Sequence, residues 1–193
     1  MSDEDLLDDC AGRIPSLPEP LAVLATGVEV ARAEGDTTGV YKRLFDLGAG
    51  VVRYAVSAGL GVLTARLAGK KAPESLGASL RKAARLSDGQ WCELGRAIGS
   101  ALRSADPAAA KALAFVSQKP LADLIASRNT FAHGGGRGDD APARAIAVLD
   151  SAAALFDLEL RAVAALDPHP SIPFLQFLLP CSMELCPALA PDS

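Results

Sequence analysis

The stretch DTTGVYKRLFDLGAGVVRYAVSAGLGVLTARLAG, residues 36–69, decides the fold. Apolar residues recur through it at the spacing that places them on one face of an α-helix. They are Val40, Leu44, Leu47, Val51, Tyr54 and Ala58. Asp36 or Thr37 can accept a hydrogen bond from the first backbone N–H groups, as a capping side chain does. The sequence therefore predicts one long helix over about residues 36–68.

Glycine interrupts this helix at positions 48, 50, 59 and 61. In an exposed helix each glycine would cost about 1 kcal/mol relative to alanine. We therefore expect these glycines where a second helix approaches closely, or where the helix kinks.

Further helices follow from the same periodicity and from capping residues and prolines at their starts. We expect them over 18–34, 72–86, 87–105, 107–117, 119–132 and 141–166. The last should bury the stripe Ile146, Leu149, Ala153, Phe156, Leu160 and Val163. No alternating strand pattern is present before residue 170. The expected fold is all-α, an up-and-down helical bundle with short connections.

Composition agrees with one helical domain. The chain has 193 residues, of which 50% are hydrophobic and only 5% aromatic. Residues 1–17 are acidic and expected to be mobile, and residues 18–166 form the bundle. Residues 167–193 are proline-rich and contain the apolar segment IPFLQFLLP. This tail is expected to dock on protein, or to begin a region that the chain lacks.

Several function classes are disfavoured. The net charge of −4 gives no overall basic field for nucleic acid, so any RNA contact must be local. Cys10, Cys92, Cys181 and Cys186 form no C-x-x-C pair, so neither a metal site nor a cofactor is expected. No run approaches the roughly 20 apolar residues that span a membrane, and no signal peptide begins the chain. We expect a cytoplasmic protein without membrane contact.

The stretch SRNTFAHGGG, residues 127–136, carries the clearest chemistry. Arg128, Asn129 and His133 lie near the end of a predicted helix, which three glycines terminate. A histidine can transfer protons near neutral pH, and an arginine can hold a phosphate. Asn129 and His133 are four residues apart and share a face, so the amide can orient the imidazole. The alternative is a surface arginine and a helix-terminal histidine without catalysis.

Arg-Asn-x-x-x-His in an all-helical chain resembles the HEPN family of helical-bundle proteins. The resemblance covers about residues 18–166 and implies a metal-independent endoribonuclease in a toxin–antitoxin or other bacterial defence system. It implies that Arg128 and His133 are catalytic and that Asn129 supports them. It also implies a homodimer with the active site at its interface, and RNA and an antitoxin or activator protein as partners. Some HEPN domains are instead non-catalytic dimerisation or sensing modules.

One position departs from a HEPN subfamily. Toxins paired with a nucleotidyltransferase antitoxin usually carry a tyrosine two residues after the histidine, where this chain has Gly135. That subfamily is therefore disfavoured.

A second candidate contact for RNA is the most basic stretch of the chain. Between residues 66 and 85 it has one acid and the six cations Arg66, Lys70, Lys71, Arg81, Lys82 and Arg85. These side chains could touch RNA phosphates. A solvated helix face explains them equally well.

Overall fold

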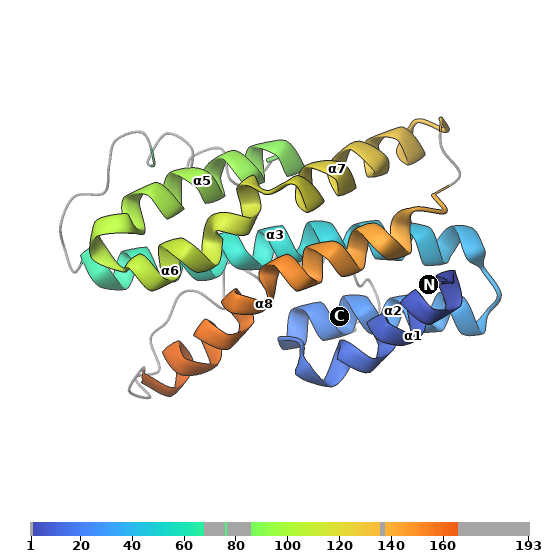
Figure 1. The fold of residues 1–193 in the computed structure, drawn as a ribbon, viewed down its shortest axis with the longest axis horizontal. Helices are drawn as coiled ribbons and strands as arrows, with labels where there is room; N and C mark the ends of the chain where they lie inside the picture. Colours follow the sequence, from blue (N-terminus) through green and yellow to red (C-terminus); the bar gives the residue numbers. More distant parts are fainter. Residues whose placement is uncertain (1, 68–75, 77–85, 136–137, 166–193) are drawn as a thin grey trace, which may run out of the picture. The chain divides into compact units, whose positions relative to one another are not determined.

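The computed structural model describes residues 2–67, 76, 86–135 and 138–165, with side chains as far as Phe156. Every element in this part of the chain is helical, which confirms the all-α prediction. In order they are α1 (Asp3–Arg13), η1 (Ile14–Ser16), α2 (Glu19–Ala33), α3 (Thr37–Leu67), α5 (Asp88–Ala105), α6 (Pro107–Ala112), η3 (Leu113–Ser117), α7 (Lys119–Ala132) and α8 (Ala141–Ala165). Figure 1 shows this order from blue to orange.

α3 is the central helix of the bundle. It contacts α2, α5, α6, α7 and η3, so it is surrounded by the other helices (Figure 1). Buried residues lie on most of its circumference and include Leu44, Leu47, Val51 and Val52, each at most 1% exposed. Five residues of the predicted stripe belong to this larger buried surface, whereas the sixth, Ala58, is only partly buried.

The glycines of α3 lie where neighbouring side chains press against its backbone. Leu124 of α7 covers Gly48, Leu24 of α2 covers Gly50, and Leu113 of η3 covers Gly59. A methyl group at any of these three positions would overlap the covering leucine. The prediction of close approach is confirmed at these three of the four glycines, and for Gly61 it stays a prediction.

By length and composition α3 could also cross a membrane. The sequence-based statement that no segment approaches that length is therefore wrong. However, 56% of its most apolar window is buried inside the protein, as in the core helix of a soluble protein. One such helix is weak evidence for a membrane span.

The N-terminal residues are helical, which corrects the expectation of a mobile segment over 1–17. Ser2 and Asp5 form a capping box, in which each side chain accepts the other residue's backbone N–H at 3.2 Å and 2.7 Å. Leu6, Leu7 and Cys10 are buried in the core. The acids of α1 lie on its outer side, where Glu4 and Asp8 bind Arg32 of α2. α1 is therefore rich in acidic residues on its outer side, while three apolar residues on its inner side pack it against the core.

The second half of the chain follows the predicted helices closely. Ser87 caps α5 and Asp106 caps α6, while prolines lie in the first turns of α6 and α7. The predicted segment 107–117 divides into α6 and the 3-10 helix η3. α8 follows the prediction as far as Ala165, and the last predicted residue, 166, lies outside the described residues.

The buried stripe of α8 runs slightly differently from the prediction. Ile146 and Leu149 are buried as expected, but Ala153 is exposed, and Ala152 and Leu155 are buried in its place. The predicted helix over 72–86 and the tail 167–193 lie outside the described residues. A second unit begins at Arg161, and only its start, the end of α8, is described.

Candidate functional site

The Arg-Asn-x-x-x-His stretch lies at the carboxyl end of α7, and glycine ends that helix. Gly134 has a φ of 74°, a left-handed conformation that glycine adopts without strain. Its N–H donates to the carbonyl of Phe131 at 3.0 Å, and the Gly135 N–H donates to that of Thr130 at 3.0 Å. This pair of bonds is a Schellman motif. His133 is therefore the C-cap residue of a well-defined helix end, and its side chain is exposed.

Two contacts fix this end of α7 to the rest of the bundle. The Phe131 ring lies 5.4 Å from that of Phe45 on α3, centroid to centroid. The Ser127 hydroxyl donates to Asp140, just before α8, at 2.6 Å. Asp140 also accepts from Arg144 at 3.0 Å. Burial alone would raise the pKa of Asp140, but these two hydrogen bonds outweigh it and lower that pKa.

Arg128 faces the bundle and belongs to a cluster of charges that we call the Asp88 junction: Arg53, Asp88 and Arg128, with Asp46 beside them. The Nη1 of Arg128 donates to Oδ2 of Asp88 at 2.6 Å. The Nη2 of Arg53 donates to Oδ1 of the same carboxylate at 3.1 Å. The Nη2 of Arg128 also lies 4.0 Å from Oδ1 of Asp46. Residues from α3, α5 and α7 thus meet at one carboxylate.

The Asp88 junction is only partly open to solvent. The Asp88 side chain is 9% exposed, whereas those of Arg53 and Arg128 are 38% and 31% exposed. Among the described polar residues Asp88 is the one that is buried. The carboxylate therefore lies below two arginines that both reach the surface.

The structure does not bring Arg128 and His133 together within one chain. Five residues along a helix turn a side chain by about 140° and advance it by about 7.5 Å. Accordingly, Arg128 faces α3 and α5, whereas His133 and Asn129 are exposed. No hydrogen bond among the described residues joins the side chains of Asn129 and His133. The structure therefore gives Arg128 a partner inside the bundle and leaves the His133 side chain open to solvent.

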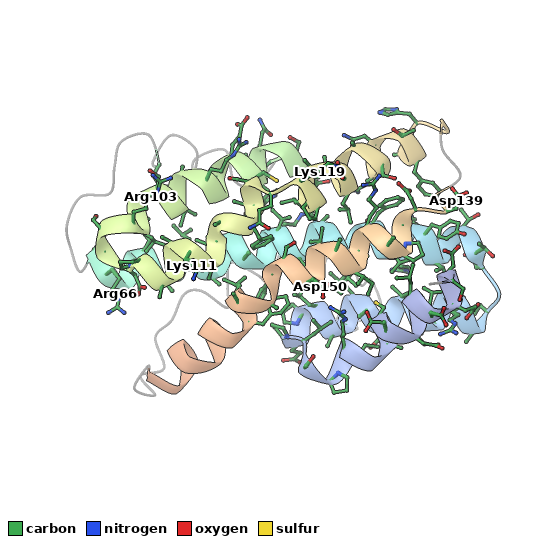
Figure 2. The ribbon with its side chains drawn as sticks, in the orientation of Figure 1. Arg66, Arg103, Lys111, Lys119, Asp139 and Asp150 are labelled. Carbon is green, nitrogen blue, oxygen red and sulfur yellow. The ribbon has the colours of Figure 1, made fainter. Side chains whose placement is uncertain are left out.

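Of the six cations in the basic stretch, the structure describes only Arg66, near the end of α3 (Figure 2). Its guanidinium donates from Nε and Nη2 to Asp106, at 3.1 Å and 3.0 Å. The backbone N–H of Ala109, and then Arg66, lower the pKa of Asp106. Arg66 thus supports the cap of α6. Its predicted companions Lys70, Lys71, Arg81, Lys82 and Arg85 lie outside the described residues.

The sequence analysis identified neither Arg53 nor Asp88 as a residue of the site. A usable signal existed for Arg53, because it is the one charged residue between Leu47 and Leu63 in a helix predicted to be buried. No comparable signal marks Asp88, whose partners are 35 and 40 residues away along the chain.

Neither a metal-binding cluster in the described residues nor a similar protein adds to the assignment of this site. In the part of the chain described here, no group of three or more His, Cys, Asp and Glu side chains is placed to hold a metal ion. Comparisons with protein families, with curated proteins and with solved structures found no match to this chain.

Proposed function

We propose that this chain is a metal-independent endoribonuclease of the HEPN type, with Arg128 and His133 as its catalytic residues and Asn129 in support. The observation that carries the proposal is the end of α7. There an exposed imidazole lies on a rigid helix terminus, about one and a half turns from an arginine fixed by Asp88. The resemblance in sequence adds a toxin or defence effector role in the bacterial cytoplasm, with an antitoxin or activator protein as partner.

The chemistry needs only these two kinds of side chain. His133 takes the proton of the ribose 2′-hydroxyl as its oxygen attacks the adjacent phosphorus. The bond from phosphorus to the 5′-oxygen breaks, and that oxygen takes the proton from the imidazolium of His133, which returns to its neutral form. Arg128 holds the phosphate and stabilises the negative charge that develops on its oxygens. The products are a 2′,3′-cyclic phosphate and a 5′-hydroxyl, and DNA is not cut because it lacks the nucleophile.

The directions of the two side chains support a homodimer. Since Arg128 and His133 leave α7 on different sides, we infer that Arg128 of one chain meets His133 of the other. An isologous two-fold interface would create two such sites.

The test is cleavage of single-stranded RNA by the wild type, His133→Ala and Arg128→Ala, with any activator present. We expect His133→Ala to lower the rate by about 10²–10⁴-fold, through loss of proton transfer. Arg13→Ala is the matched control, since the Arg13 side chain is 29% exposed, close to the 31% of Arg128, and binds two acids, Asp9 and Asp150. Cleavage should persist in EDTA. If the wild type cuts RNA no faster than either site variant, the proposal is wrong.

One observation favours a second candidate, a non-catalytic HEPN-like dimerisation or sensing module. Arg128 binds a nearly buried carboxylate, which gives it a structural role without catalysis. On that reading Arg128→Ala lowers the melting temperature, His133→Ala changes nothing, and no variant or wild type cleaves RNA.

A further inference from the structure

We propose that Arg53 and Arg128 together bind one phosphodiester of single-stranded RNA at the surface of the Asp88 junction. Arg53 would then be a second phosphate-binding residue, contributed by the central helix α3. The proposal rests on the proposed function for its ligand, RNA, but binding can be measured without cleavage.

The first argument is the number of acceptors. Two guanidinium groups donate to the one carboxylate of Asp88, at 2.6 Å and 3.1 Å. Asp46 balances the charge of the second arginine, but its Oδ1 lies 4.0 Å from Nη2 of Arg128, beyond hydrogen-bond distance. A half-buried guanidinium is costly unless its donors are satisfied. A phosphate would supply the missing acceptors.

The second argument is the number of donors that remain. A guanidinium carries five N–H groups. Within the described residues, Arg53 and Arg128 each make one hydrogen bond, and both make it to Asp88. The Nε of Arg53 is buried without a partner, so it is not one of the donors that a ligand from solvent can reach. Because both side chains are about one third exposed, donors remain for a ligand that arrives from solvent.

The third argument is how the two arginines are held. Asp88 accepts one arginine on each of its oxygens, so the two guanidiniums are fixed as neighbours. A phosphodiester has two non-bridging oxygens and matches such a pair of donors. Asp88 is also the first residue of α5, where the helix dipole adds positive potential. The opposing charge is Asp46, which is 29% exposed and should weaken the site.

The experiment measures binding of a short single-stranded RNA by fluorescence anisotropy, in a His133→Ala background, as a function of salt. We expect Arg53→Gln to weaken binding about three- to tenfold. It should also reduce the slope of log K against log salt by about 0.7, the value for one lost phosphate contact on a single strand. Arg53→Lys should retain the slope, because it keeps the charge.

Two further variants separate a phosphate site from a structural role. Asp46→Asn removes the opposing charge and should tighten binding about twofold. Arg13→Gln, the control for a paired arginine elsewhere, should change neither the affinity nor the slope. The affinity for a DNA strand of the same sequence should fall by the same factor in Arg53→Gln, since the contact is to phosphate.

The outcomes distinguish this proposal from the proposed function. If the His133→Ala parent binds no RNA at low salt, or if Arg53→Gln leaves both affinity and slope unchanged while the protein stays folded, the phosphate site does not exist. Cleavage by the wild type would then still support the endoribonuclease. Conversely, if RNA binding depends on Arg53 and Asp46 but the wild type does not cleave RNA, the phosphate site is established and the proposed nuclease activity is refuted.

Discussion

Replacing Gly48 by alanine tests whether α7 depends on a close approach to α3. A methyl group at Gly48 would lie 2.5 Å from Cδ1 and 2.8 Å from Cδ2 of Leu124, the leucine of α7 that covers it. Leu124 is fully buried, so its side chain has little room to move aside. The substitution must therefore push the two helices apart or force Leu124 from its rotamer.

Two opposing effects set the size of the change. Alanine is the better helix former and would gain about 1 kcal/mol. Overpacking a close-packed core costs about 1–3 kcal/mol. Because the overlap involves two carbon atoms of a side chain without solvent access, we expect the cost to prevail, with a net destabilisation of about 1–2 kcal/mol. At about 2–4 °C for each kcal/mol, the melting temperature should fall by several degrees.

Gly99→Ala is the matched control. Gly99 lies in the interior of α5, and a methyl group there would meet only Cβ of Leu113 at 3.8 Å, an ordinary van der Waals contact. Only the gain in helix propensity remains, so this variant should be about 0.5–1 kcal/mol more stable. Urea unfolding of the two variants should thus give changes of opposite sign. A Gly48→Ala protein as stable as Gly99→Ala would refute the packing argument.

Three other predictions concern pH, capping and assembly. Burial raises the pKa of the Cys10 thiol from 9.0 to about 11, so the unfolded state ionises first as pH rises. The free energy of unfolding should fall by about 2–3 kcal/mol between pH 9 and 11, and urea titrations of Cys10→Ala should lack that fall. Asp106→Ala removes the cap of α6 and should cost about 0.5–2 kcal/mol at pH 7 by urea unfolding. Because the pKa of Asp106 is lowered, wild-type stability is lost as pH falls below 3.8, and the difference should shrink there. Light scattering at tens of micromolar should give the mass of two chains, and a monomer would contradict the dimer.

The helices could be predicted because their signals are local. Caps such as Ser87 and Asp106, and prolines in the first turns, fix where a helix begins, whatever packs against it. Apolar periodicity identified much of the buried face. It failed at Ala153, where the face of α8 is shifted by one residue toward Ala152. Such a shift depends on which helices pack against α8, and the apolar periodicity of one helix carries no information about its neighbours.

The N-terminal helix was missed for a different reason. Acidic composition was interpreted as disorder, although the capping box of Ser2 and Asp5 and the apolar Leu6, Leu7 and Cys10 were already present in the sequence. The candidate site shows the deeper limit. Arg128 and His133 lie five residues apart in the sequence, but the partner that fixes Arg128 is Asp88, which comes near only when α5 and α7 both pack against α3. Spacing along the chain could not indicate that contact.

The opposite directions of Arg128 and His133 make the composite site testable with two inactive variants. In a two-fold dimer each site would take Arg128 from one chain and His133 from the other. A mixed dimer of Arg128→Ala and His133→Ala chains then has one site that lacks both groups and one intact site. With random pairing, half of the dimers are mixed, so co-expression should restore about a quarter of wild-type RNA cleavage. If both groups acted within one chain, every site in the mixture would lack one of them and no activity would return. Since Arg128 reaches inward to Asp88 while His133 is exposed, recovery is the outcome that this geometry predicts.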